Sequence, residues 1–120
     1  MAHSPEKLLA DILAACSAIS AFTLGRTRDE YAADLMLRSA VERQLEILGE
    51  AIRRLGALDP ERVARISEHR RIIAMRNIIA HGYDGLDNDV VWQAVGEKIV
   101  IVQREAGTML NELDPEADIG

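Results

Sequence analysis

Apolar residues recur at intervals of three and four over most of this 120-residue chain, and this spacing constrains the fold more than any other feature. It places apolar side chains on one face of an α-helix. Three prolines, two of them near the ends, leave room for long helices. We find no alternation typical of strands, no internal repeat and no interdomain linker. The chain is therefore predicted to be all-α, an antiparallel helical bundle of four to five helices.

Glycine, proline and capping residues divide the chain into these helices. The predicted helices cover, in order, about residues 5–24, 28–55, a short stretch opened by Asp59-Pro60, the stretch that ends near 81, and about 89–113. Thr27 and Glu30 have the spacing of a capping box at the start of the second helix. Gly56 is expected to stop that helix, and Ser67 to cap the fourth.

Composition places the chain among small globular proteins. A hydrophobic content of 48% predicts a single domain over residues 1–120, with about 1–4 and 114–120 flexible. The single cysteine, Cys16, excludes an internal disulfide, and we expect it to be a small core residue. Asp11 interrupts the apolar region that a signal peptide needs, and no stretch reaches the roughly 18 apolar residues of a membrane span. A cytoplasmic protein is expected.

Residues 76–83 carry several side chains that can bind a ligand or transfer a proton. Their order is Arg76-Asn77-Ile78-Ile79-Ala80-His81-Gly82-Tyr83. An arginine is a planar cation that suits phosphate, and a histidine exchanges protons near neutral pH. Asparagine both donates and accepts hydrogen bonds, and tyrosine adds a phenolic hydroxyl. Glycine at position 82 is expected to stop the helix. The octet is therefore a candidate site, although the same residues can simply cap, end and pack a helix.

Helical geometry limits what this octet does within one chain. Asn77 and His81 are four residues apart and share a helix face. Arg76 and His81 are five apart, which separates them by about 140° around an ideal helix. They converge on one phosphate only if His81 leaves the helix at Gly82, or if a second chain completes the site.

The octet fits the R-N-x-x-x-H-x-Y pattern of the HEPN superfamily, and the chain resembles the HepT-like toxins most closely. The resemblance also takes in residues 43–51, 73–75, 84–87 and 91–92, and it covers roughly residues 8–110. HepT-like toxins are ribonuclease partners of minimal nucleotidyltransferases. The resemblance implies a homodimer that cleaves RNA without a metal ion in a cleft shared by two chains.

The resemblance also implies a form of regulation. In HepT-like systems the nucleotidyltransferase antitoxin silences the toxin by transferring AMP to the tyrosine of the motif, which is Tyr83 here. The sequence departs from the family pattern at Gly82, where many relatives carry a larger, often acidic residue. A glycine there is expected to loosen the loop that carries Tyr83.

Cleavage of RNA without a metal needs a base for the 2′-hydroxyl, an acid for the leaving 5′-oxygen and a cation for the phosphate. We assign His81 as the general acid/base, Arg76 as the cation and Asn77 as the residue that orients His81 or the phosphate. A symmetric dimer that joins two octets supplies both an acid and a base. No metal or cofactor is expected, because the histidines are scattered and form no pair at ligand spacing.

Charge supports two different partners. The net charge of −6 is unusual for an RNA-binding protein. However, residues 53–76 hold seven arginines against three acidic residues, a net charge of +4, which leaves −10 for the remainder. Arg70 and Arg71 are therefore candidates for binding RNA, either tRNA or mRNA. The acidic remainder suits protein contacts, and it leaves open a non-catalytic helical partner that binds a nucleotidyltransferase or a nucleotide.

Overall fold

The computed structural model describes residues 4–82 and 86–115, and within these ranges the chain is helical and contains no strand. The helices are α1 (Pro5–Thr23), α2 (Arg28–Ala33), α3 (Leu35–Leu58), α4 (Pro60–Val63), α5 (His69–Ala80), α6 (Asn88–Glu97) and α7 (Ile99–Leu113). The all-α prediction is confirmed. The predicted number of helices is too low, because two of the expected long helices are each divided in two. The expected flexibility of residues 1–3 and 116–120 lies outside the described residues.

Side chains close in the sequence cap several helices, and the predicted starts at Thr27 and Asp59 are confirmed. The hydroxyl of Ser4 accepts a hydrogen bond from the Lys7 N–H at 3.1 Å and caps α1. Thr27 and Glu30 form the expected reciprocal capping box at the start of α2, with bonds of 3.1 and 2.9 Å. Asp59 accepts from the Arg62 N–H at 3.2 Å and starts α4. In each case the cap lies within a few residues of the group that it satisfies.

The predicted helix over residues 28–55 is wrong in both its continuity and its end. Asp34 divides it, because its carboxylate accepts the Leu37 N–H at 3.0 Å and so caps a new helix, α3. The guanidinium of Arg26 also donates to Asp34 at 2.9 Å and holds the break in place. At the other end, α3 continues through Gly56 to Leu58. The glycine lies against Val63 of α4, so here it packs within a helix instead of ending one.

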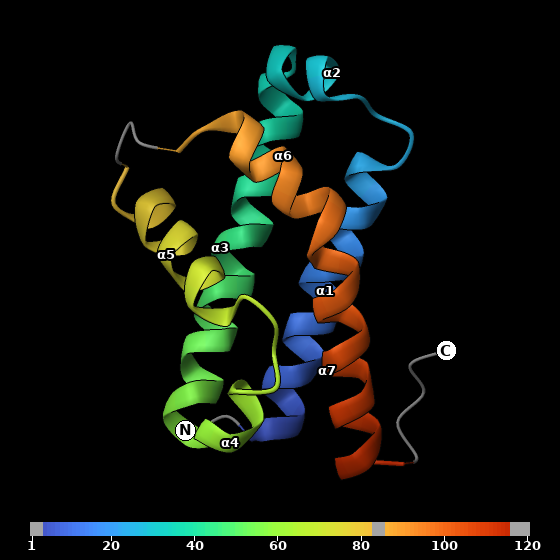
Figure 1. The fold of residues 1–120 in the computed structure, drawn as a ribbon, viewed down its shortest axis with the longest axis vertical. Helices are drawn as coiled ribbons and strands as arrows, with labels where there is room; N and C mark the ends of the chain where they lie inside the picture. The colour runs from blue at the N-terminus through green and yellow to red at the C-terminus, as the bar shows by residue number, and fades with distance from the viewer. Residues whose placement is uncertain (1–3, 83–85, 116–120) are drawn as a thin grey trace.

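The predicted helix over residues 89–113 is also divided. The helix bends at Lys98, which lies between the end of α6 and the start of α7. The backbone angles of Lys98 are φ −109° and ψ −31°. Gly96 lies two residues before the bend, and glycine weakens a helix. The bend lets α6 cross the end of the bundle and contact α2, while α7 runs along α1 (Figure 1).

The helices are arranged around α1 and α3 (Figure 1). The long helix α3 packs against α1 on one side and α5 on the other, and α1 also packs against α7. The core is aliphatic apart from Tyr31, whose ring centroid lies 5.3 Å from that of Trp92. Cys16 is fully buried, as expected, and burial raises the pKa of its thiol to about 12. Because α5 packs mainly on α3, much of its surface is open.

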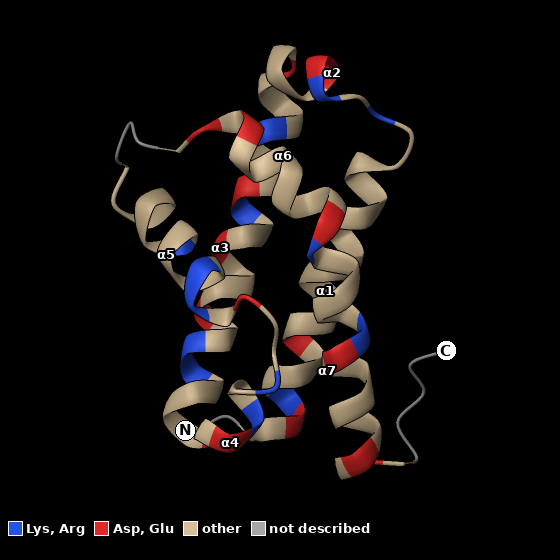
Figure 2. Cartoon of the chain, in the orientation of Figure 1, with Lys and Arg blue, Asp and Glu red and all other residues tan. Residues whose placement is uncertain are grey.

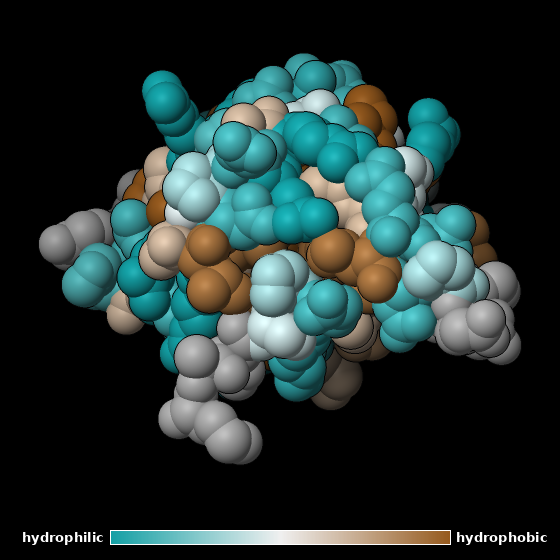
Figure 3. Space-filling model, turned by 90° about the horizontal axis from the view of Figure 1, so that it is seen from below, coloured by the Kyte–Doolittle hydropathy of each residue, from teal (hydrophilic) through white to brown (hydrophobic). Residues whose placement is uncertain are grey.

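The end of the molecule that carries α4 is predominantly hydrophilic, with separate apolar areas between the polar side chains (Figure 3). Among the described residues, no helix combines the length and apolar character that crossing a bilayer requires.

Candidate active site

The helix α5 carries most of the predicted site residues. Its apolar side is held against α3 by Ile72 and Met75, which are buried. The outward face of the helix carries three exposed residues, Arg70, Asn77 and His81. They are seven and four residues apart, which is helical spacing. The prediction that Gly82 stops the helix is confirmed. It has a φ of +65°, which favours glycine, and its N–H donates to the Ile79 carbonyl at 3.1 Å.

The Arg76 side chain passes directly over Gly49 of α3. A Cβ atom added to Gly49 would lie 2.3 Å from the Cβ of Arg76 and 3.2 Å from the Ile72 carbonyl oxygen. Real Cβ atoms do not approach other atoms so closely, so the two helices can be this close only because residue 49 has no side chain. Gly49 therefore sets the depth at which Arg76 lies on the protein surface.

The Arg76 guanidinium is held by Glu50, the next residue on α3. Its Nη2 lies 3.3 Å from Oε1 of Glu50, and its Nη1 donates to the Asn77 side-chain oxygen at 3.0 Å. The Nε of Arg76 is buried and has no hydrogen-bond partner among the described residues. The side chain is 25% exposed, so part of it is accessible to solvent. Arg76 is thus fixed in place with hydrogen-bonding capacity to spare.

Glu50 forms ion pairs with three arginines, Arg53, Arg54 and Arg76, and is the main electrostatic feature of the site. Arg53 donates two hydrogen bonds to it, both at 2.9 Å, and Arg54 donates one at 2.8 Å. These bonds, those of Arg53 first, lower the pKa of Glu50 to about 2 even though partial burial opposes the change. Glu50 is therefore ionised at neutral pH and leaves a local excess of positive charge.

Sequence reasoning assigned no role to Gly49 or Glu50. Both lie in the segment 43–51 that carries the family resemblance, but nothing local in the sequence connects them with Arg76. A partial signal was present, because Glu50 precedes Arg53 and Arg54 by three and four residues, a spacing that favours ion pairs on a helix. The contact with Arg76 depends on how α3 and α5 pack together.

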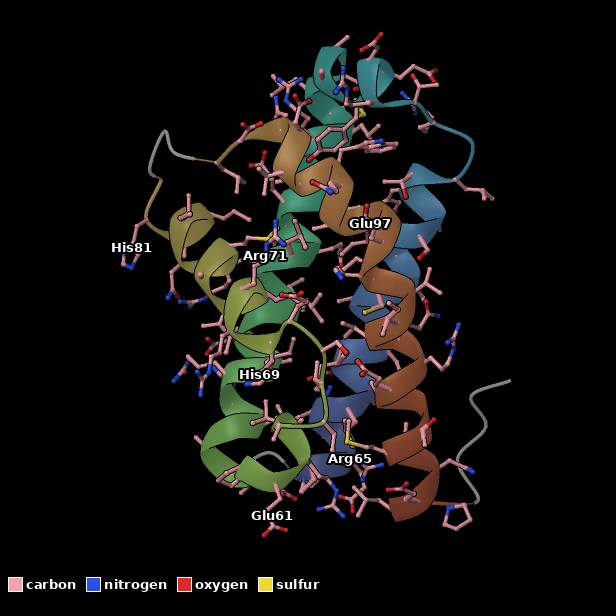
Figure 4. The ribbon with its side chains drawn as sticks, viewed as in Figure 1. Glu61, Arg65, His69, Arg71, His81 and Glu97 are labelled. Atoms are coloured by element: carbon pink, nitrogen blue, oxygen red, sulfur yellow. The ribbon has the colours of Figure 1, made fainter. Side chains whose placement is uncertain are left out.

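His81 and Arg76 are not brought together within one chain. Arg76 faces α3, whereas His81 points outward from the end of α5, away from the bundle (Figure 4). The His81 backbone N–H donates to the Asn77 carbonyl oxygen at 3.1 Å, and the Asn77 side chain bonds to Arg76 instead. Among the described residues, the Asn77 side chain is therefore bonded to Arg76, the cation of the predicted site. Tyr83 lies outside the described residues.

The two arginines predicted to bind RNA are exposed on the first turns of α5. Neither Arg70 nor Arg71 forms an ion pair with another described residue. Arg71 and His81 point in different directions from α5 (Figure 4). Lysine and arginine positions gather along the neighbouring parts of α3 and α5 (Figure 2). This basic flank contrasts with the net negative charge of the chain.

An open cleft of about 380 Å³ adjoins Arg76. Its lining comes from α1, α3 and α5, namely Leu8, Asp11, Arg43, Glu46, Ile47, Glu50, Ala51, Arg54 and Arg76. Its lining includes three arginines and three carboxylates, and an arginine there can bind an anion such as a phosphate. Within residues 4–82 and 86–115, no three His, Cys, Asp or Glu side chains are placed to hold one metal ion.

Comparison with known proteins identifies the family to which this chain belongs. The Ribonuclease HepT-like family matches residues 12–109, so the chain belongs to that family. It is 32% identical over 100 residues to "Putative RNase MJ1380" of Methanocaldococcus jannaschii, covering 83% of this chain and 91% of the relative. It is 33% identical over 99 residues to "Probable ribonuclease HepT" of Thermococcus cleftensis, covering 82% of this chain and 89% of the relative.

A third relative is about twice as long as the part that this chain matches. The protein named "Gamma-glutamylcyclotransferase and putative RNase MJ0434" of Methanocaldococcus jannaschii is 31% identical over 103 residues, which is 86% of this chain but 46% of the relative. No solved structure matches the chain. The family and the names of these relatives support ribonuclease activity.

Proposed function

We propose that this protein is a metal-independent endoribonuclease that cleaves RNA in a cleft formed by two copies of the chain. The observation that carries the proposal is the arrangement of α5 in a member of a ribonuclease family. Arg76 is fixed at the surface while His81 is presented at the open end of the same helix. A single chain offers one cation and one motif histidine that face different directions. A symmetric dimer through the exposed side of α5 would supply two of each.

The proposed reaction is an internal phosphoryl transfer. One His81 takes the proton from the 2′-hydroxyl, whose oxygen attacks the adjacent phosphorus. The bond from phosphorus to the 5′-oxygen breaks, and the partner subunit's His81 gives a proton to that oxygen. Arg76 stabilises the negative charge on the phosphoryl oxygens in the transition state, and Asn77 keeps the guanidinium in place through its 3.0 Å bond. The products are a 2′,3′-cyclic phosphate and a 5′-hydroxyl.

Glu50 has a supporting role in this proposal. It holds the Arg76 side chain in one orientation before RNA arrives, so less conformational entropy is lost on binding. Because Arg53 and Arg54 also neutralise Glu50, Arg76 keeps positive potential for a phosphate. Arg70 and Arg71 are exposed on the first turns of α5 and would add phosphate contacts along the RNA strand.

We further propose that the ribonuclease is the toxin of a type II-like toxin-antitoxin pair, with a minimal nucleotidyltransferase as its antitoxin. Tyr83 lies two residues after His81, so an AMP group on its hydroxyl would bring a phosphate and considerable bulk to the same end of α5. The modification would therefore block the cleft. Mass spectrometry after co-expression with the nucleotidyltransferase should find an AMP-sized increase on Tyr83 that Tyr83→Phe abolishes. An unmodified Tyr83 in a fully inhibited complex would point to inhibition by binding alone.

The direct test is cleavage of tRNA and mRNA by the purified protein, with and without EDTA. Cleavage should persist in EDTA and leave cyclic phosphate ends. His81→Ala and Arg76→Ala should each reduce the rate about 10²–10⁴-fold while the circular dichroism spectrum stays helical. Arg28→Ala is the control, since Arg28 is exposed beside Asp89 at the α2 end of the bundle. Full activity of both site variants would refute the assignment.

The same assay addresses the alternative function. A protein that cleaves no RNA but binds the nucleotidyltransferase would be a non-catalytic partner. Light scattering at micromolar concentration tests the dimer, and a monomer at that concentration would contradict a composite cleft.

A further inference from the structure

The start of α5 lacks the local signals that usually begin a helix. Ser67, which was predicted to cap α5, does not do so. The residue at the cap position is Glu68, which makes no side-chain capping bond. Its φ of +60° lies in the left-handed region, where a residue with a side chain is strained. The His69 ring Nδ1 lies 2.8 Å from the Ile66 carbonyl oxygen and gives this turn one local contact. The strained residue also needs external support.

That external support is a carboxylate on α7. Glu105 accepts two hydrogen bonds from Ser67, one from its backbone N–H at 2.9 Å and one from its hydroxyl at 2.7 Å. Both partners are partly buried, so water competes with these bonds less than it would at an open surface. An ionised acceptor makes stronger hydrogen bonds than a neutral one. The Ser67 hydroxyl is thus used on α7, which explains why it does not cap α5.

Glu105 belongs to a row of three tethers along α7. Lys98 lies 3.7 Å from Glu68, and Glu112 accepts two bonds from Arg65 at 2.9 and 3.0 Å. Positions 98, 105 and 112 are seven residues apart, so they lie on one side of the helix. The loop between α4 and α5 runs along this side, over the front of the bundle (Figure 1), and Arg65 lies beside the lower part of α7 (Figure 4). Of these tethers, the one made by Glu105 includes a bond from a backbone N–H.

The tether matters because α5 is anchored on few sides. It packs chiefly against α3, and His81 at its far end is exposed. The helix has 12 residues, and at 1.5 Å per residue it is about 18 Å long. A tilt of about 3° at its start would therefore move its far end by about 1 Å. A displacement of that size can reduce the rate of a reaction about 10²-fold.

We infer that Glu105 is a positioning residue for the site on α5. Its carboxylate holds Ser67, fixes the strained entry into α5, and thereby sets where the helix presents Arg76 and His81. Glu105 itself lies on a different helix and acts only through α5. The inference about catalysis rests on the proposed function, whereas the inference that Glu105 holds the start of α5 does not.

The test compares Glu105→Ala, Glu105→Gln and Ser67→Ala with a matched control, Glu112→Ala. Glutamine can still accept the Ser67 N–H bond and donate to the Ser67 hydroxyl, so it should restore what alanine removes. Glu112 lies two turns along the same side of α7 and also binds the loop, but its side chain is 48% exposed. An exposed ion pair contributes little, so its loss should change neither readout.

The first readout is hydrogen exchange of the α5 amides relative to those of α3. Glu105→Ala should speed exchange in the first turns of α5 by about tenfold or more, and Ser67→Ala by less. Glu105→Gln should stay within about threefold of the wild type. If Glu105→Ala exchanges like Glu112→Ala, the inference is wrong. Should Glu105→Ala fail to fold, Ser67→Ala decides the question, because it removes only the hydroxyl bond.

The second readout is the single-turnover rate of RNA cleavage, at a temperature where every variant is fully folded. Glu105→Ala should be at least about tenfold slower, with Glu105→Gln close to the wild type. A lower melting temperature with an unchanged rate would show a role in stability alone and would overturn the positioning role. If the wild type cleaves no RNA, the proposed function fails, while the exchange data still decide whether Glu105 holds α5.

Discussion

The contact between Gly49 and Arg76 makes a prediction opposite to the usual rule for glycines in helices. Replacing a helical glycine by alanine normally stabilises a protein by about 1 kcal/mol, because alanine has the higher helix propensity. At Gly49 the added methyl group would lie 2.3 Å from the Arg76 Cβ and 2.8 Å from its Cγ. The Arg76 Cβ belongs to the α5 framework, so it cannot simply rotate away. Relief requires α5 to move outward by about 1 Å.

The expected cost can be estimated from these distances. Overpacking a close contact costs about 1–3 kcal/mol, which outweighs or cancels the gain in helix propensity. Gly49→Ala should therefore be less stable than glycine-to-alanine variants elsewhere by about 1–3 kcal/mol. In a domain of this size that is a fall in melting temperature of about 3–15 °C relative to those variants. RNA cleavage should fall too, because Arg76 and the Glu50 contact move with α5.

Two glycines provide matched controls within the same bundle. A Cβ at Gly96 would meet nothing within 4 Å, and one at Gly56 would be in ordinary contact with Val63 at 3.4 Å. Both are helical, so Gly96→Ala and Gly56→Ala should raise the melting temperature or leave it unchanged. Thermal unfolding followed by circular dichroism, at one fixed protomer concentration, measures all three. The reasoning is refuted if Gly49→Ala is as stable as Gly96→Ala.

Three further predictions concern stability, local structure and reactivity. The pKa of Glu50 is lowered from its ordinary value of 4.5 to about 2. Its ionised form therefore stabilises the fold fully above pH 4.5, and this stabilisation is lost as the pH falls from 4.5 through about 2. Glu50→Gln should therefore melt below the wild type at pH 7, with the difference shrinking on acidification; a constant difference would contradict this. Asp34→Ala should lower the free energy of unfolding by about 1 kcal/mol, measured with denaturant, because the α3 cap is lost. Asp34→Asn should lower it by less, since asparagine can also cap a helix. Equal effects would show that the ion pair with Arg26 matters more than the cap. Cys16, with its pKa raised to about 12, should resist alkylation at pH 8 until the protein is unfolded, and rapid labelling of the folded protein would refute its burial.

The sequence was sufficient for features whose cause lies within a few residues. The apolar spacing predicted an all-α fold, and the capping box of Thr27 and Glu30 is formed as expected. The helix stop at Gly82 is likewise present. A cap or a stop satisfies backbone groups of its own turn, so the residues responsible are adjacent in the chain. The octet could be recognised as a candidate site for the same reason, because its chemical groups are crowded into eight consecutive positions.

Other local signals were ambiguous without the tertiary structure. An aspartate within a predicted helix can be an exposed side chain or a cap, and Asp34 caps α3 while Arg26 holds the break. Gly56 resembled a helix stop, but it packs against Val63 inside α3. Ser67 resembled a helix cap, but its hydroxyl is bound by Glu105 on α7. In each case a contact with a residue outside the helix in question chose between two local possibilities.

The environment of the site was decided by tertiary structure alone. Arg76 is 26 residues from Glu50, and the contact exists because Gly49 lets α5 approach α3 closely. The sequence named the cation and the histidine, and helix geometry predicted that they diverge. Which groups surround the cation, how deeply it lies and what holds the start of its helix depend on contacts between α3, α5 and α7. Such contacts follow from the packing of whole helices, which no local pattern of residues specifies.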